Sequence, residues 1–389
     1  MNKKEGSHAG LRTWIEIDRK AIKHNFGVFK SLISKKANPP KNGRVKLMAV
    51  VKSNAYGHGL VDFSREMEKL GADFLGVDSV VEALALRRVG IKVPILVLGY
   101  TLPEMIAPAV EADIALTISH REGLKAVLAT KTSKSPKIHI KVDTGMHRQG
   151  FLLGEQKTLI AKLKGQKSKV IIEGLMTHFA AAKNPSFPKD TKNQMVEFKE
   201  WISAFHAAGL NPIIHAAATS GTMLFPEAHF DMVRIGIGLY GLWPAEEVGA
   251  HLKDQYQLKP VLVWKSFISE IKKLPKGARV GYDLTEAMSD DGAIAVIPIG
   301  YWHGYPRALS SIGRVIIGGK ECKVVGRVSM DMLTVDVSRV RKVAVGDEVI
   351  ILGKEGSSPA SAEGMAKLIN ESWYEIITRL NPLIRRLYR

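Results

Sequence analysis

The sequence holds a single cysteine, Cys322, so no intramolecular disulfide framework is available to the chain. No stretch approaches the roughly 18 uncharged apolar residues that a membrane-spanning helix needs. The N-terminal segment MNKKEGSHAGLRTW carries basic residues without a following apolar stretch, so we expect no secretory signal there. Together these absences predict a cytoplasmic protein that has no membrane partner.

Several common site motifs are also missing. No HExxH motif or Cys/His cluster predicts a metal ion, and no P-loop or dinucleotide glycine fingerprint predicts a nucleotide. Acidic residues are in deficit, with 38 of them against 56 lysines and arginines, which gives a net charge of +18. The basic residues are scattered and are not interleaved with aromatic residues. We therefore predict a solvated basic surface and no nucleic-acid partner.

The apolar residues are organised in two ways along the chain. From residue 45 onward, apolar runs that end at a polar residue or a glycine alternate with amphipathic stretches. The eight runs are Val45–Val51, Phe74–Val77, Val93–Leu98, Ile114–Ile118, Ile138–Val142, Val170–Thr177, Ile213–Ala218 and Met232–Val233. Eight strand–helix units predict an α/β fold, a (β/α)8 TIM-like barrel whose active site lies at the carboxyl ends of the strands. We place this barrel at residues 12–255, including a strand at Trp14–Asp18 and a helix at Ala21–Leu32.

After about residue 256 the pattern changes to short β-branched runs that are separated by glycine, proline and aspartate. These runs are Pro260–Ile271, Ala293–Ile299, Arg314–Ile317, Lys323–Val328, Leu333–Val337 and Glu348–Leu352. They predict a β-rich C-terminal domain at residues 256–389. Within it we expect a hairpin turn at Gly318-Gly319 and one late helix at Ala362–Asn370.

Lys52 is the first candidate catalytic residue. It follows the apolar run Val45–Val51 and precedes the segment Ser-Asn-Ala-Tyr-Gly-His-Gly. A lone lysine at a strand end is commonly an exposed cation. Here hydrogen-bonding side chains and two glycines follow it, which is typical of a loop that folds closely around a small polar ligand. Because a desolvated lysine loses its proton easily, Lys52 is a candidate nucleophile.

The segment AVVKSNAYGHG resembles the pyridoxal-phosphate lysine motif of the alanine racemase family, and the resemblance extends over nearly the whole chain. It implies the same barrel and β-rich domain that the strand pattern predicts independently. It also implies the cofactor pyridoxal 5'-phosphate, bound covalently to Lys52, with Tyr56 as a phosphate ligand. Considered alone, Tyr56 is equally compatible with a packing role.

The segment KVDTGMHRQG, from Lys141 to Gly150, resembles a second motif of the family. The resemblance implies that Arg148 orients the substrate carboxylate and the phenolic oxygen of the cofactor, since a guanidinium holds anionic oxygens in a fixed geometry. In many family members the lysine at the position of Lys141 is carbamylated and fixes this arginine. Lys141 is therefore a candidate for that modification, and an ion pair with Asp143 is the alternative.

Three further segments supply candidate cofactor ligands. A single histidine at a strand end is more often structural, but the resemblance places His178 beside the cofactor ring. The segment ATSGT resembles the family's phosphate motif with an uncertainty of one residue, so Thr219 is the first candidate phosphate ligand and Ser220 the second. Backbone amides near Gly236 and Ile237 are expected to complete the phosphate site.

Arg234 corresponds to the family's arginine that faces the pyridine nitrogen of the cofactor. Since an arginine keeps its own proton, the ring nitrogen stays unprotonated and the cofactor withdraws electrons more weakly, which favours racemisation over transamination.

Tyr282, in the segment GYDL, matches the family's second catalytic base, which is contributed across the interface of a homodimer with shared active sites. A free tyrosine, with a pKa of about 10, is a weak base catalyst near neutral pH, so the mechanism needs neighbours that favour proton removal, and we expect His178 and Arg234 to supply that setting.

Two segments of the C-terminal domain complete the candidate site. The segment SMD matches a loop that lines the substrate entrance, so Met330 is a candidate substrate-binding residue. The segment WYEI resembles the family's C-terminal site motif and makes Tyr374 a further phosphate or gate contact. Each of these residues alone is compatible with simple packing, and their occurrence at matching positions supports a site.

The resemblance predicts an enzyme that interconverts L-alanine and D-alanine by a two-base mechanism and supplies D-alanine for bacterial peptidoglycan. Lys52 would act on one face of the substrate and Tyr282 on the other.

A racemase of broader specificity, or one for serine or lysine, would share every motif. A fold-type III decarboxylase would be expected to carry a cysteine near the β-domain site, and Cys322 lies in no such motif. A non-catalytic cofactor-binding protein would need only the barrel.

Overall fold

The computed structural model describes residues 10–34, 43–166, 169–353 and 358–389, so most of the N-terminal segment considered above lies outside it. The chain divides into two compact units. The barrel unit comprises Ile22–Ala55 and Leu60–Lys259, and the β unit comprises Met1–Ala21, Tyr56–Gly59 and Pro260–Arg389. Within the described ranges, no helix combines the length and the apolar character that crossing a membrane requires.

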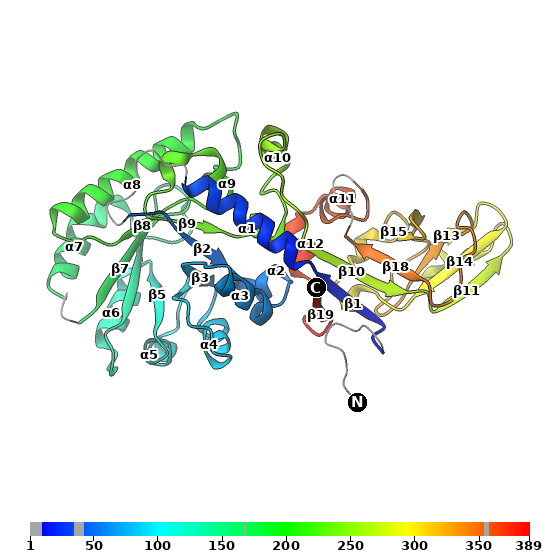
Figure 1. Ribbon diagram of the computed structural model, residues 1–389, viewed down its shortest axis with the longest axis horizontal. Coiled ribbons are helices and arrows are strands. Elements are labelled where there is room, and N and C mark those ends of the chain that lie inside the picture. Colours follow the sequence, from blue (N-terminus) through cyan, green and yellow to red (C-terminus); the bar gives the residue numbers. More distant parts are fainter. Residues whose placement is uncertain (1–9, 35–42, 167–168, 354–357) are drawn as a thin grey trace. The chain divides into compact units, whose positions relative to one another are not determined.

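The barrel unit is built on eight parallel strands (Figure 1). They are β2 (Lys46–Val50), β3 (Phe74–Val77), β4 (Ile95–Val97), β5 (Ile114–Ile118), β6 (Lys137–Lys141), β7 (Ile171–Met176), β8 (Ile213–His215) and β9 (Met232–Ile235). Their order is β8-β7-β6-β5-β4-β3-β2-β9. The two end strands are joined by backbone hydrogen bonds from Asp231 N to Ile214 O and from Arg234 N to Ala217 O, each 2.9 Å long. The strands therefore form a nearly closed barrel, and the predicted (β/α)8 fold is confirmed.

Side chains fill the inside of this barrel and helices cover its outside, so the strands are buried on both faces. One interior cluster takes a single residue from each of six strands, namely Met48, Phe74, Leu96, Ala115, Met176 and Met232. The helices of the unit are α1 (Arg19–Ser34), α3 (Leu60–Lys69), α4 (Val80–Arg88), α5 (Pro103–Glu111), α6 (Arg121–Ala129), α7 (Gln156–Lys164), α8 (Lys189–Ala207), α9 (Thr219–Leu224) and α10 (Glu246–Leu252). Short 3-10 helices lie at η1 (Leu153–Glu155), η2 (Pro226–Ala228) and η3 (Ile237–Tyr240).

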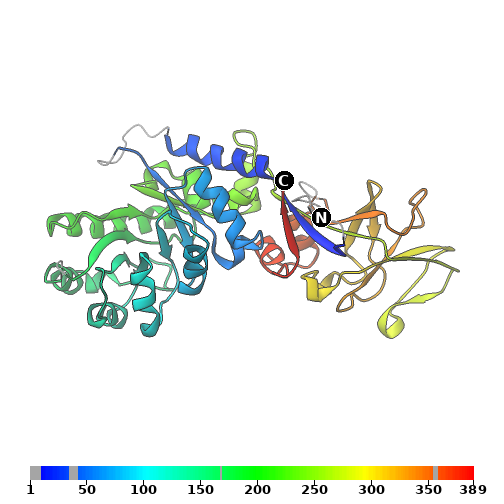
Figure 2. The same ribbon diagram turned by 60° about the horizontal axis from the view of Figure 1, so that its bottom comes forward.

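The β unit contains three sheets, whose C-terminal strands are coloured from yellow to red in Figure 2. The six-stranded sheet has the order β16 (Lys320–Lys323), β15 (Arg314–Ile317), β18 (Glu348–Leu352), β10 (Leu262–Phe267), β1 (Thr13–Ile17) and β19 (Arg385–Tyr388). A second sheet joins β11 (Glu270–Leu274), β14 (Gly292–Ile297) and β17 (Leu333–Asp336), and a third pairs β12 (Arg279–Val280) with β13 (Glu286–Ala287). The helices are α11 (Ala362–Leu368), α12 (Trp373–Thr378), η4 (Tyr282–Leu284), η5 (Tyr301–His303) and η6 (Arg307–Leu309). The prediction that the C-terminal domain is rich in β-strands is therefore confirmed.

Several local features of the β unit differ from the sequence prediction. The run Pro260–Ile271 forms two strands, β10 and β11, in different sheets. Strand β16 lies before the predicted run Lys323–Val328, because the tight turn at Gly318 and Gly319, with φ of 54° and 76°, brings Lys320 opposite Ile317. Strand β1 pairs with β10 and β19, and not with a barrel strand. The residue limits predicted for the two domains stay a prediction.

Candidate active site

Lys52 stands directly after β2 and begins a turn in the left-handed conformation. This turn is α2 (Lys52–Tyr56), in which residues 53–56 have φ values of 56°, 56°, 51° and 51°. Left-handed backbone costs L-residues about 1–2 kcal/mol each, so the surrounding structure must hold the turn. Strain of this kind is concentrated at functional sites.

Glu82 of α4 holds the left-handed turn. Its Oε1 accepts hydrogen bonds from the backbone N–H groups of Ser53 at 2.7 Å and Asn54 at 3.3 Å. Its Oε2 accepts another from Asp78 N at 2.9 Å, and Asp78 in turn forms an ion pair of 3.2 Å with Lys52 Nζ. One carboxylate thus links the turn of Lys52 to the next strand end. The sequence analysis did not identify Glu82, because nothing in its position on a helix marks this contact.

Arg234 is a buried cation at the end of β9. Its Nη1 donates to His215 Nδ1 at 2.9 Å and to His215 O at 3.0 Å. Its Nη2 donates to Thr177 O and Ala216 O, both at 2.8 Å, and to His178 Nδ1 at 3.2 Å. Burial lowers the pKa of Arg234 to about 10, so the group stays charged near neutral pH. Among the described residues its Nε meets no hydrogen-bond acceptor, which leaves one N–H group available to a ligand.

His178 is held in its neutral form. Burial, together with the positive charges of Arg234, Arg148, Lys141 and Lys52, lowers the pKa of His178 to about 3. Since Nδ1 of the neutral ring accepts from Arg234, the proton of His178 lies on Nε2. The same interactions show that four cationic groups of the predicted site lie near one another in the barrel unit.

The loop after β6 carries Arg148. Asp143 Oδ1 accepts three backbone hydrogen bonds of 3.0 Å, from residues 145–147, and this fixes the start of the loop. At the other end, Gly150 has φ of 139°, and a Cβ there would overlap the backbone of Val142 and Asp143. The Arg148 side chain is exposed, and no described side chain forms a hydrogen bond or ion pair with it. The structure thus leaves the Arg148 guanidinium accessible to an anionic ligand.

Lys141 is buried at the end of β6, and its Nζ donates to Gln149 Oε1 at 3.1 Å. Burial and the charges of Arg148 and Arg234 lower the pKa of Lys141 to about 8. No ion pair joins Lys141 to Asp143 in the described structure, so the simpler alternative for this lysine is not observed. A substantial neutral fraction of the amine therefore exists near neutral pH.

The residues predicted to bind phosphate in the barrel unit lie around the start of α9. Thr219 and Ser220 are buried there, and Gly236 N donates to Thr219 Oγ1 at 3.2 Å. The first backbone N–H groups of a helix have no partner within the helix, and among the described residues no side chain caps α9. A Cβ at Gly238 would overlap Phe29, which shows how closely the chain packs after Ile237. The structure brings these residues together and leaves the choice between Thr219 and Ser220 as a prediction.

Tyr56 and Tyr374 lie together in the β unit, with ring centroids 6.1 Å apart. Burial and the neighbouring Tyr56 raise the pKa of Tyr374, so its hydroxyl keeps its proton and can donate. The segment after Tyr56 is held tightly. Arg386 of β19 donates two hydrogen bonds, of 2.9 and 3.1 Å, to Gly57 O, and a Cβ at Gly57 would overlap Ile377 O. Two predicted phosphate contacts, Tyr56 and Tyr374, are thus neighbours although they lie 318 positions apart in the sequence.

Tyr282 and Met330 lie on exposed loops of the β unit, with 68% and 55% of their surface accessible. Tyr282 begins η4, after Gly281 with φ of 78°. The loop of Met330 is fixed to its neighbour by a hydrogen bond of 3.0 Å from Trp302 N to Met330 O. Further large apolar side chains are exposed on these loops, namely Leu284, Tyr301, Trp302 and Met332. Exposed apolar surface of this kind is typical of protein interfaces.

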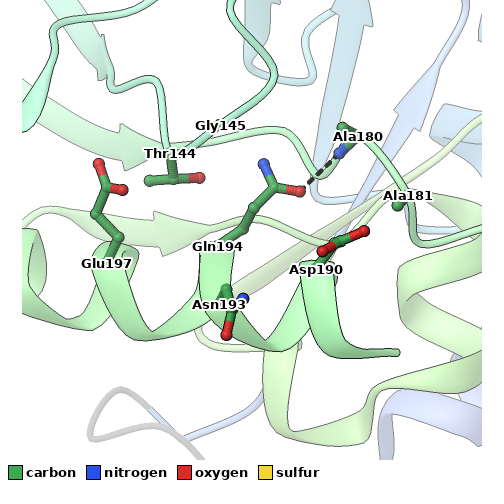
Figure 3. Close-up of a pocket in the computed structure, with 8 residues that line it drawn as sticks. All are labelled: Thr144, Gly145, Ala180, Ala181, Asp190, Asn193, Gln194 and Glu197. Carbon is green, nitrogen blue, oxygen red and sulfur yellow. Dashed lines mark hydrogen bonds between the residues drawn. The ribbon is translucent and has the colours of Figure 1, made fainter. Parts of the chain in front are cut away.

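A cavity of about 330 Å³ lies beside the loops that follow β6 and β7 (Figure 3). It is lined by Thr144, Gly145, Ala180, Ala181, Asp190, Asn193, Gln194 and Glu197. Gln194 Oε1 accepts a hydrogen bond of 2.9 Å from Ala180 N. The carboxylates of Asp190 and Glu197 would repel a phosphate, and none of the predicted site residues lines this cavity. In the described part of the chain, no group of three or more His, Cys, Asp or Glu side chains is suited to a metal ion.

Three buried or partly buried residues that the sequence analysis missed continue the contacts of Arg234. His215 Nε2 lies 2.9 Å from His139 Nδ1, and His139 Nε2 lies 3.0 Å from Glu173 Oε2. A signal was present, because His139 and Lys141 are two residues apart in one strand and therefore share a face. Glu173 is also an acidic residue inside an apolar strand run.

Comparisons with known proteins agree over nearly the whole chain. Residues 17–244 match the family model described as "Alanine racemase, N-terminal domain", and residues 261–388 match "Alanine racemase, C-terminal domain". The chain is 39% identical over 393 residues to "Alanine racemase" of Symbiobacterium thermophilum, covering 97% of this chain and 98% of the relative. It is 37% identical over 378 residues to "Alanine racemase 2" of Oceanobacillus iheyensis, covering 97% and 93%.

Solved structures give the same result. The alanine racemase of Clostridium difficile 630 superposes with a TM-score of 0.89 at 31% identity, covering 97% of this chain and 96% of the other. The alanine racemase of Bacillus anthracis with bound L-Ala-P has a TM-score of 0.88 at 34% identity, covering 97% and 95%.

Proposed function

The chain belongs to the alanine racemase family, and from this we propose that it interconverts L-alanine and D-alanine by a two-base mechanism with pyridoxal 5'-phosphate. Membership of the family makes it an enzyme of the isomerase class. The observation that most supports the proposal is the buried Arg234, whose Nη atoms are bound by protein acceptors while its Nε meets none in the described structure.

The residues present fit this cofactor. The free N–H of Arg234 suits an unprotonated ring nitrogen, which is an acceptor. Thr219 or Ser220, with the backbone amides of Gly236 and Ile237, suits a phosphate, and so do the Tyr56 and Tyr374 hydroxyls. Lys52 supplies the amine for the covalent bond to the cofactor. When bound, the cofactor withdraws electrons and so acidifies the Cα–H bond of an amino acid.

Arg234 and His178 set the protonation state of the site. Arg234, with a pKa of about 10, does not give up its proton near neutral pH. His178, with a pKa of about 3, stays neutral and can only accept from Arg234 through Nδ1. Neither Arg234 nor His178 can protonate the ring nitrogen of the cofactor near neutral pH, so electron withdrawal by the cofactor stays modest. Return of the proton to Cα is thereby favoured over transamination.

Two bases are needed because inversion removes the α-proton from one face of the substrate and returns it to the other. We assign the D-face to Lys52 and the L-face to Tyr282 of the partner subunit. The high exposure of Tyr282, 68%, supports a role across an interface, since its own β unit does not enclose it. The proposed protein is therefore a homodimer with shared active sites.

Arg148 and Lys141 form the proposed substrate carboxylate site. Arg148 would bind the carboxylate, and Met330 would line the entrance. The neutral form of Lys141, whose pKa is about 8, can react with carbon dioxide to form a carbamate and release a proton. The carbamate is negative where the protonated lysine is positive, so the repulsion from Arg148 is replaced by attraction. Carbamylated Lys141 would then hold the Arg148 guanidinium in position.

The proposed physiological role is supply of D-alanine for peptidoglycan in the cytoplasm of a bacterium. The experiment that tests the function incubates the purified holoenzyme separately with L-alanine, L-serine, L-lysine and L-arginine and measures each D-enantiomer by chiral chromatography. Turnover of alanine far above the others is the expected result. Preferred turnover of a larger amino acid would reassign the substrate, and absence of any D-product would overturn the proposed reaction.

A further inference from the structure

We propose that Glu173 is a positioning residue for Arg234: through His139 and His215 it fixes the hydrogen-bond donors that hold the guanidinium in place. This inference rests on the proposed function, because Arg234 is the residue assigned to the cofactor ring. The contacts run from Arg234 through His215 and His139 to Glu173 within the barrel unit. Arg234 is the one predicted site residue among these four.

The chain of contacts is continuous across four strands. Arg234 Nη1 lies 2.9 Å from His215 Nδ1, and His215 Nε2 lies 2.9 Å from His139 Nδ1. His139 Nε2 lies 3.0 Å from Glu173 Oε2. The two imidazole rings meet edge to face, with centroids 5.1 Å apart. Both histidines are fully buried, whereas the Glu173 side chain keeps 21% of its surface accessible.

The chemistry of these groups allows one direction of donation when both rings are neutral. A guanidinium has only donors, so His215 Nδ1 must accept, and the ring proton of His215 lies on Nε2. That proton is donated to His139 Nδ1, which places the proton of His139 on Nε2 as well. An ionised carboxylate only accepts, so Glu173 is the natural end of the chain.

The charges around the chain are consistent with this direction. Burial and the charge of Arg234 lower the pKa of His215 well below its usual value, so its ring stays neutral. Burial acts to raise the pKa of Glu173, whereas the hydrogen bond from His139 and the positive charge of Lys137 lower it, and the net pKa is lowered. Glu173 is therefore ionised near neutral pH and can end the chain as an acceptor. No carboxylate contacts Arg234 directly in the described structure. Glu173, at the far end of the chain of contacts, is therefore the negative charge that balances the charge of Arg234.

The packing around His139 leaves the ring little freedom. A Cβ at Gly174 would overlap the His139 ring, so a residue without a side chain is required there. On another side the ring of Phe74 meets it edge to face, with centroids 6.2 Å apart. If Glu173 no longer accepted a hydrogen bond, the ring would keep its place and its Nε2–H would lose its acceptor. The effect of changing Glu173 should thus appear at the Nε2–H of His139 before it appears in the fold.

The first test is made on the parent protein, and variants serve only to assign its signals. Nitrogen NMR of the apoprotein labelled with 15N-histidine, with the His139 and His215 signals assigned by single replacements, reports which ring nitrogen carries the proton. We expect Nε2–H and an unprotonated Nδ1 for both residues. An Nδ1–H tautomer or an imidazolium at either residue would overturn the proposal, whether or not the protein racemises alanine.

The second test compares Glu173→Leu with Glu173→Gln and with a matched control, Glu68→Leu. Glu68 of α3 also accepts hydrogen bonds, from the N–H groups of Lys92 and Val93, but it lies outside the chain of contacts. In Glu173→Leu we expect a shifted Nε2–H signal of His139, because this N–H loses its acceptor, and about tenfold weaker cofactor binding, since a hydrogen bond to a charged group is lost. Glu173→Gln keeps an acceptor oxygen and should retain most of the parent signal and affinity, and Glu68→Leu should match the parent.

An unchanged Nε2–H signal of His139 together with unchanged cofactor affinity in folded Glu173→Leu would overturn the assignment of Glu173. If that variant does not fold, Glu173→Gln and the tautomers of the parent protein still test the proposal. A parent protein that shows the expected tautomers but makes no D-alanine would contradict the proposed function alone, so the two failures can be told apart.

Discussion

Arg234 Nη1 lies 2.9 Å from His215 Nδ1, and this contact fixes the orientation of a buried cation before any ligand is bound. The other Nη atom is held equally by backbone oxygens of Thr177 and Ala216. Because the guanidinium is planar, fixing both Nη atoms also fixes the direction of its Nε–H. A donor that is already oriented needs no reorganisation when its ligand arrives, which is the general advantage of a preorganised polar site.

Replacement of Tyr282 by phenylalanine should stop turnover and leave the cofactor bound. The variant loses only a hydroxyl on an exposed loop, so its fold should not change. Cofactor absorbance of the purified variant and its rate of D-alanine formation are the two measurements. A variant that racemises at the parent rate would remove Tyr282 from the mechanism.

Two inactive variants should restore activity when they form mixed dimers. Co-expression of Lys52→Ala and Tyr282→Phe chains produces dimers in which one site carries both changes and the other carries neither, if each site takes Lys52 from one chain and Tyr282 from its partner. With random pairing, about a quarter of the parent activity is expected. The control is each variant expressed alone. No recovery in verified mixed dimers would show that the two residues do not act across subunits.

His178 should make the fold less stable in acid. Its pKa is lowered to about 3 in the folded protein, whereas an unfolded chain has about 6.5. Between these values the unfolded state binds more protons, so the contribution of His178 is complete above about pH 6.5 and is lost as the pH falls toward 3. The loss is on the order of a few kcal/mol. In urea unfolding at several pH values, His178→Asn should show a weaker acid dependence than the parent, and an identical dependence would contradict the assignment.

Lys141 should take up carbon dioxide as the pH rises. Because its pKa is lowered to about 8, the neutral amine, which is the reactive form, increases through that value. Equilibration with 13C-labelled bicarbonate should give a carbamate signal in the carbon NMR spectrum that is stronger at pH 8.5 than at about pH 6.5. Lys141→Arg is the control and should lack the signal. The same spectrum in Lys141→Arg and the parent would exclude carbamylation of this residue.

The barrel could be predicted from the sequence because each strand is a local apolar run with a polar residue after it. Tyr282 and Arg234 are proposed as site residues from motifs that are contiguous in the chain. The pairing of β1 with β19 could not be found, since a short alternating strand such as β1 does not specify its partner. The left-handed turn at residues 53–56 was also missed. Its residue types, apart from asparagine, do not favour that conformation, and the distant Glu82 stabilises it.

The contacts of His139 were missed for a related reason. Its partners come from other strands, and only the curvature of the barrel places His215 and Glu173 on either side of it. The spacing of His139 and Lys141 shows that they share a face of one strand, but no spacing in the sequence shows the partners of His139. Contacts between residues far apart in the sequence could therefore not be predicted, whereas continuous motifs could be read as candidate site residues.

Racemisation through Lys52 can be tested by incubating the purified protein and its Lys52→Ala variant with L-alanine and pyridoxal phosphate and measuring D-alanine. We expect the parent protein to produce D-alanine until the enantiomers are equal, and Lys52→Ala, although folded, to produce none. Full activity in Lys52→Ala would contradict the assignment of this lysine. Cofactor binding by the parent without any D-alanine would contradict the proposed reaction itself.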